Sequence, residues 1–254
     1  MSIYFSSPKE QKNPFKELLF FVILILIFGG VVLAFYSDFF QINRIIFAHN
    51  TNVVLQDTAK IIEPIRKKNN NIFLFDTYRA ERLLEGIPKV LSVKILRKLP
   101  KTLVIDIKER IPALIWQTGS HTFYVDENGY AFTEIKKGIG YPIIVDRAIL
   151  PVKIGQRVVN NDFVKFVNRL DVNFTRKTKL KRVAMYILDT TLELIIETDN
   201  GIKILFATDR DVDIQLSHLA TALKRITGQS ISYIDLRIDK WIYYCPKGAE
   251  CSKS

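Results

Sequence analysis

The chain has few of the residues that usually build metal centres and disulfide scaffolds. Its 254 residues include two cysteines and three histidines. The cysteines, Cys245 and Cys251, lie close together near the C-terminus, and no histidine is near enough in sequence to complete an ordinary zinc site with them. They can close a small disulfide loop in an oxidising compartment or remain two free thiols, and the sequence favours neither.

Signatures of catalysis are missing as well. His49, His121 and His218 lie far apart, and none has a cysteine, histidine or carboxylate at metal-ligand spacing. The sequence has no G-x-S-x-G, no H-E-x-x-H and no glycine-rich phosphate loop. We therefore expect a binding protein rather than an enzyme, without catalytic residues, cofactor or metal.

One acidic run resembles a calcium loop by spacing. Asp209, Asp211 and Asp213 alternate, but the required glycine is missing and Ala220 occupies the position of the bidentate glutamate. The run therefore predicts capping and charge complementation of the helix that follows it.

The formal charge of +11 makes the chain basic. A basic chain can bind nucleic acid or an anionic surface, or simply carry an excess of solvated lysine. No cluster interleaves basic and aromatic residues as single-strand binding requires. We expect no nucleic-acid partner.

The longest apolar run, Leu18–Tyr36, has nineteen residues without a charge, enough to span a bilayer core of ~30 Å. Lysines precede it and Asp38 follows it, so the positive-inside rule predicts a cytoplasmic N-terminus. Phe39 and Phe40 can lie at the outer membrane–water interface as part of an aromatic belt. The alternative is a signal peptide cleaved near Val32-Leu33-Ala34, but the run exceeds the ~7–15 residues usual for a signal-peptide core.

The next region predicts a small α+β layer. We expect a strand over 40–47 and a helix from 54, after a turn at 50–52, that stops or kinks near Glu63 because of Pro64. A polar loop over 66–71, a core segment over 72–75 and a short helix over 78–84 follow. The alternation over 91–96 and 103–108 then predicts a β-hairpin that Pro112 ends. The helices should cover one face of the sheet.

The remainder predicts a mixed β module. Asn128-Gly129 favours a hairpin over 123–132, because both residues tolerate positive φ. After a loop-rich stretch over 136–160 we expect a helix over 163–170, strands over 183–187, 191–197 and 202–206, and a helix over 214–226.

Several short motifs in this order resemble the FtsQ/DivIB family of bacterial division proteins. They are NIFLFD at 71–76, IPKV at 87–90, RKLP at 97–100, and IDIKERIP at 105–112 followed by Ala113 and Trp116. Later pieces are VDENGYAF at 125–132, YPII at 141–144 and YIDLR at 233–237. The resemblance implies a strand over 231–237 and a short last strand over 241–244. The resemblance covers about residues 40–244.

The resemblance implies a single transmembrane helix, a POTRA domain (β-α-α-β-β) and a C-terminal mixed β domain with two helices. The implied divisions are a cytoplasmic tail at 1–17, the membrane helix at 18–36, the POTRA domain at 39–111, the β domain at 112–244 and a tail at 245–254. The protein would sit in the cytoplasmic membrane at the septum, with both domains outside.

The resemblance also implies a non-enzymatic scaffold that recruits FtsB- and FtsL-like proteins, while its POTRA domain docks other divisome proteins. In this family the last strand takes up an FtsB segment by strand addition, which assigns partner binding to Trp241, Ile242, Tyr243 and Tyr244. A bridge between Cys245 and Cys251 would stiffen the tail after this strand. The alternatives are a POTRA protein of outer-membrane secretion or assembly, and an envelope enzyme with an unrecognised site.

Overall fold

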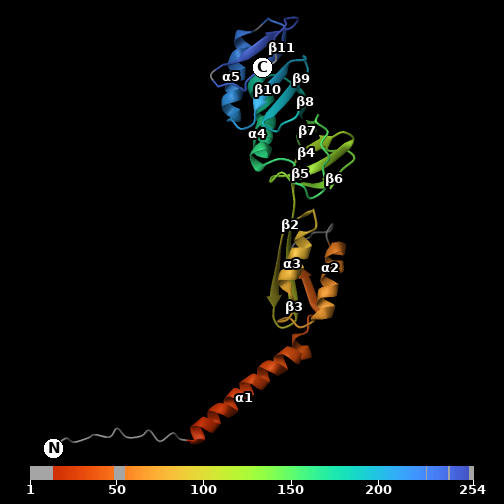
Figure 1. Cartoon of the computed structure of the whole chain (residues 1–254), viewed down its shortest axis with the longest axis vertical. Helices are drawn as coiled ribbons and strands as arrows, with labels where there is room; N and C mark the ends of the chain where they lie inside the picture. The colour runs from red at the N-terminus through yellow and green to blue at the C-terminus, as the bar shows by residue number, and fades with distance from the viewer. Residues whose placement is uncertain (1–13, 49–54, 227, 240, 252–254) are drawn as a thin grey trace, which may run out of the picture. The chain divides into compact units, whose positions relative to one another are not determined.

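The structure, a computed structural model, describes residues 14–48, 55–226, 228–239 and 241–251 (Figure 1). The chain divides between Lys108 and Glu109 into two compact units. The first contains helix α1 and a small α+β domain, hereafter the first domain. The second is a larger sheet domain, hereafter the second domain. Each is described on its own.

Helix α1 runs from Pro14 to Tyr36. By length and composition its segment Pro14–Leu33 could cross a membrane. The helix includes Pro14–Glu17, which we predicted to be part of a polar tail, and residues 1–13 lie outside the described chain. A retained anchor and a signal sequence share this length and composition, so retention stays a prediction.

The first domain has the predicted strand, helix, helix, strand, strand order, preceded by a short 3-10 helix. Its elements are η1 (Asp38–Phe40), β1 (Arg44–Phe47), α2 (Leu55–Lys68), α3 (Thr77–Glu85), β2 (Val90–Lys98) and β3 (Thr102–Glu109). The sheet order is β1-β3-β2, with β1 parallel to β3. Alternate residues of β3, Leu103, Ile105 and Ile107, are buried against α2 and α3, as a half-buried strand requires.

Three of the sequence motifs of the first domain, at 71–76, 87–90 and 97–100, lie at its turns, whereas the motif at 105–112 begins on β3. The Asn71 side chain accepts a hydrogen bond from the Phe73 N–H, and Asp76 caps α3 by accepting from the Arg79 N–H. Arg97 donates from Nε to the Ile72 carbonyl at 2.8 Å and from Nη2 to the Phe75 carbonyl at 2.9 Å. One side chain at the end of β2 thus fixes the turn that precedes α3.

Three predictions for this domain were wrong. The first strand begins at Arg44 rather than Phe40, because residues 38–40 form η1. Helix α2 continues through Pro64 to Lys68, so residues 66–68 are helical rather than part of a loop. Within 72–75 only Ile72 and Phe75 are buried, because the chain turns here and directs Phe73 and Leu74 to solvent. The predicted turn at 50–52 and His49 lie outside the described residues.

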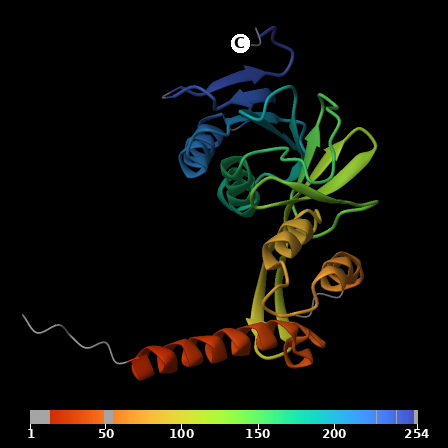
Figure 2. The same cartoon turned by 60° about the horizontal axis from the view of Figure 1, so that its bottom comes forward.

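The second domain is built on one mixed sheet of nine strands. Its strands are β4 (Pro112–Thr118), β5 (His121–Asp126), β6 (Ala131–Glu134), β7 (Ile143–Asp146), β8 (Arg182–Ile187), β9 (Glu193–Thr198), β10 (Lys203–Ala207), β11 (Ile231–Asp235) and β12 (Tyr243–Pro246). The order is β12-β11-β10-β9-β8-β7-β4-β5-β6. Helices α4 (Asn161–Thr178) and α5 (Val212–Arg225) pack on one face, as Figure 2 shows, and bury the main core there.

The hairpin of β5 and β6 contains the motif at 125–132 and connects it to the motif at 105–112. Gly129 has a φ of +84°, and a Cβ there would lie 1.9 Å from the Val159 carbonyl oxygen, so glycine is required. The buried Asp126 accepts hydrogen bonds from the N–H groups of Asn128 and Tyr130 and forms an ion pair with Arg110. The motif at 105–112 is therefore tied to the motif at 125–132.

Several strand boundaries of the second domain differ from those predicted. Pro112 begins β4 as well as following β3, and it suits this place because the first residue of a strand needs no ladder N–H. The last strand begins two residues later than expected and extends through Cys245 to Pro246.

Candidate partner-binding edge

The last strand, β12, forms one end of the nine-stranded sheet. It pairs antiparallel with β11, where Tyr243 lies opposite Asp235 and Tyr244 opposite Ile234. Among the described residues, no strand pairs with its other side. Alternate backbone N–H and C=O groups of such an edge strand point outward and can pair with an added chain.

The four residues predicted to bind a partner divide into two groups. Trp241, Tyr243 and Tyr244 are 68%, 53% and 44% exposed, whereas Ile242 packs against the main core. Opposite residues of an antiparallel pair share a face of the sheet. Tyr244 therefore lies on the face covered by the helices, and Tyr243 on the open face. The edge presents aromatic side chains on both faces.

The chain after β12 folds back and holds the strand in place. Cys245 is buried and forms a disulfide with Cys251, whose Cα lies 6.0 Å away. The Lys247 N–H donates to the Ser230 carbonyl at 2.7 Å, which ties the start of β11 to the residue after β12. Residues 245–251 are thus part of the second domain.

Beside β11, the open face of the sheet carries an ion-pair cluster. Arg237 donates to Asp235 at 2.6 Å and to Glu193 at 2.6 Å, and the Asp235 side chain is buried. The hydrogen bond to Asp235, with a smaller contribution from Glu193, raises the pKa of Arg237 above its ordinary range. The guanidinium therefore stays charged at every pH of interest.

A shallow groove of about 430 Å³ extends from this cluster along the open face. Arg147 stacks over the Tyr186 ring at 3.5 Å, and burial raises the pKa of the Tyr186 hydroxyl above its ordinary value despite the nearby cation. Arg147, Tyr186 and Glu193 were not singled out from the sequence. They come from three different segments, and only the strand order brings them together.

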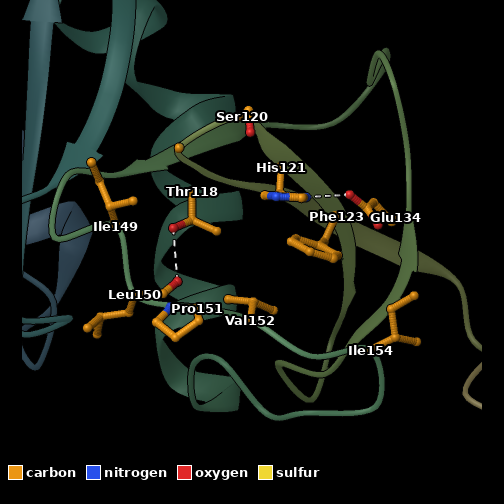
Figure 3. Close-up of a pocket in the computed structure, with 11 residues that line it drawn as sticks. Thr118, Ser120, His121, Phe123, Glu134, Ile149, Leu150, Pro151, Val152 and Ile154 are labelled. Atoms are coloured by element: carbon orange, nitrogen blue, oxygen red, sulfur yellow. Dashed lines mark hydrogen bonds and ion pairs between the residues drawn. The ribbon is translucent and has the colours of Figure 1, made fainter.

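A second hollow, of about 440 Å³, lies near the opposite end of the sheet (Figure 3). His121 Nδ1 and Glu134 Oε1 are 2.7 Å apart at its side, and apolar residues of the 149–154 loop surround it. Both members of the pair are exposed. Thr118 and Ser120 also line the hollow, but the Thr118 hydroxyl donates to the Leu150 carbonyl. Among the described contacts, no hydrogen bond joins Ser120 to His121 as nucleophile and base.

The acidic run caps a helix as predicted. Asp211 is the N-cap of α5 and accepts from the N–H groups of Asp213 and Ile214. Hydrogen bonds from Lys177 and Arg169 lower the pKa of Asp213 below its ordinary value. His218 is exposed. The described part of the chain brings together no group of three or more side chains suited to a metal ion.

Fold and edge together define a two-domain α+β protein, with a β-α-α-β-β domain followed by a mixed β domain whose last described strand lies at the edge of its sheet. Comparison with known proteins gives the same division. Residues 40–110 match the profile "POTRA domain, FtsQ-type", and residues 114–237 match "Cell division protein FtsQ/DivIB, C-terminal". Cell division protein FtsQ of Chloroflexus aurantiacus is 28% identical over 196 residues, which cover 75% of this chain and 70% of that protein.

The chain belongs to the FtsQ/DivIB family. Proteins of this family are non-enzymatic division proteins, so the prediction that the chain is not an enzyme is confirmed on that ground. It is an FtsQ/DivIB-type cell division protein, and membership implies partners within the divisome.

Proposed function

We propose that this protein is a membrane-anchored scaffold that recruits an FtsB-like protein, and FtsL with it, by adding a partner strand to β12. Its POTRA domain docks other divisome proteins. The polypeptide is anchored by α1 at the septal membrane, with its N-terminus in the cytoplasm and both domains outside. The observation that carries the proposal is the unpaired side of β12.

The chemistry of this edge suits an extended peptide. Main-chain hydrogen bonds to the free side of β12 would supply affinity whatever the partner's sequence. Trp241, Tyr243 and Tyr244 are large, rigid and exposed, and aromatic residues of this kind contribute most of the binding energy at protein interfaces. The disulfide and the hydrogen bond between Lys247 and Ser230 fix β12 in place before a partner binds. Less of the chain must then be ordered on binding, which reduces the entropic cost.

Binding to the extracytoplasmic segments of the host's FtsB- and FtsL-like proteins tests the proposal. The full chain in detergent should bind them, and the double variant Trp241→Ala, Tyr243→Asp should raise Kd about tenfold or more. Tyr78→Ala is the matched control, because Tyr78 is an equally exposed aromatic residue of the first domain. No binding by the wild type would refute the recruitment role, and equal loss in both variants would refute the β12 site.

A further inference from the structure

At one end of the first domain, three chain segments expose apolar side chains together. Phe39 of η1 is 57% exposed, Phe73 and Leu74 of the turn before α3 are 41% and 48% exposed, and Leu99 of the turn between β2 and β3 is 56% exposed. We call these four residues the apolar rim. They are distant in sequence, and the proposed function uses none of them.

The rim residues are held together by the fold. The Ile72 N–H donates to the Phe40 carbonyl at 2.9 Å, and the rings of Phe40 and Phe73 lie 5.1 Å apart, which joins η1 to the turn before α3. Lys101 Nζ lies 5.7 Å from the centroid of the Phe39 ring, which joins η1 to the β2–β3 turn. Figure 2 shows that turn at one end of the domain.

Arg97 joins the turn before α3 to the end of β2, where the β2–β3 turn begins. It does so by donating to the carbonyls of Ile72 and Phe75. Lys98 ends β2, and Lys101 lies in the turn that follows it. The rim is therefore a fixed surface of apolar residues with cations beside it.

The length of the chain limits how far the rim can be from the end of α1. The helix ends at Tyr36, and Phe40 is already bonded to the first domain. Four residues span at most ~14 Å when extended. Here they span less, since Phe40 N–H donates to the Ser37 carbonyl and residues 38–40 form a 3-10 turn. The polar layer on each side of a bilayer is about 5–8 Å thick. The four residues that connect α1 to the first domain are therefore short enough to keep the rim within reach of that layer.

We propose that the apolar rim lies in the interfacial layer of the bilayer and contacts phospholipid directly. Aromatic side chains favour this depth, and the neighbouring lysines suit lipid phosphates. The inference rests on the proposed membrane anchor. It assigns Phe73, Leu74 and Leu99 to the membrane surface, although they lie 37 to 63 residues beyond the end of α1 in sequence.

Tryptophan quenching by brominated phosphatidylcholine tests this in the full chain reconstituted into vesicles. Single substitutions Phe73→Trp and Leu99→Trp place the probe on the rim, at exposed positions that tolerate a larger ring. Leu91→Trp is the matched control, because Leu91 is exposed at the other end of β2, ~23 Å from the rim at the rise of a strand. Leu24→Trp reports on α1 itself. Each signal is compared with that of the unsubstituted chain, which contains Trp116 and Trp241.

We expect added quenching at positions 24, 73 and 99 and none at position 91. Quenching at 24 without quenching at 73 and 99 would overturn the rim proposal and leave the anchor in place. Quenching at 91 equal to that at 73 would also overturn it, since the domain would then lie along the membrane. Absence of quenching at 24 would refute the anchor, and the rim proposal with it.

Discussion

Single side chains at the ends of elements account for part of the motifs that resemble the family's, alongside core residues such as Ile72 and Trp116. Asn71 and Asp76 satisfy backbone N–H groups at the start of α3. Asp126 does so in the turn between β5 and β6. These groups would otherwise lack partners, so the choice of residue is strict where the choice of core residue is not.

Arg97 stabilises the turn before α3 through two hydrogen bonds, and its loss should lower the stability of the first domain. Replacing it with alanine removes both hydrogen bonds to the carbonyls of Ile72 and Phe75, so we expect the free energy of unfolding of the first domain to fall by about 1–2 kcal/mol. Arg97→Lys should recover only part of the loss, because an ammonium lacks the planar fork that reaches two acceptors. Urea unfolding followed by circular dichroism measures the change.

Lys98→Ala is the control for Arg97, since Lys98 is the exposed neighbour on the same strand. It should change the stability by less than about 0.5 kcal/mol. If Arg97→Ala behaved like Lys98→Ala, the two hydrogen bonds would be stabilising nothing and the turn before α3 would be set by its own residues.

At the scale of elements, the periodicity of apolar residues predicted the helices and most strands. It gave the wrong end for α2, where burial of apolar residues outweighed the tendency of proline to end a helix. Pro64 predicted a helix end because proline lacks the N–H that an interior position donates. Yet Ile61 and Ile65 on either side of it pack against the core, and Pro64 itself is exposed. Burial of the flanking residues carries α2 past the proline to Lys68.

Pro64→Ala should therefore stabilise the first domain. Alanine restores an N–H that can bond to the Lys60 carbonyl, and interior proline is about 3 kcal/mol less favourable than alanine. The unfolded chain is more flexible with alanine than with proline, and this offsets up to ~1 kcal/mol of the stabilisation. The free energy of unfolding should therefore rise by about 2 kcal/mol. Lys67→Ala, an exposed change in the last turn of the same helix, should have little effect. A fall in stability for Pro64→Ala in urea unfolding would mean that the fixed proline φ is itself required.

The order of the nine strands could not be predicted from the sequence. β7 pairs in parallel with β4 and with β8, and so connects the two halves of the sheet, but it has only four residues inside a loop-rich stretch. Periodicity gives the existence of a strand and says nothing of its neighbours. The last strand was predicted from the family resemblance rather than from periodicity, and nothing in the sequence predicted the groove lined by Arg147, Tyr186 and Glu193.

At the scale of the whole molecule, the described residues form two hydrophobic cores with no residue in common. One contains Leu103 and surrounds β3, and the other contains Phe206 and lies between the nine-stranded sheet and its two helices. Each core belongs to one of the two compact units. Domains with separate cores are expected to fold as separate units.

Both tryptophans of the chain, Trp116 and Trp241, belong to the second domain, so tryptophan fluorescence in urea reports that domain alone, while circular dichroism reports both. Leu103→Ala removes a fully buried side chain and should lower the stability of the first domain by about 2–5 kcal/mol, shifting the dichroism transition and leaving the fluorescence midpoint unchanged. Phe206→Ala should do the reverse, with a shift of about 3–5 kcal/mol in the fluorescence transition. A fluorescence midpoint that moved with Leu103→Ala would show that the two cores unfold as one, and separate folding of the domains would then be refuted.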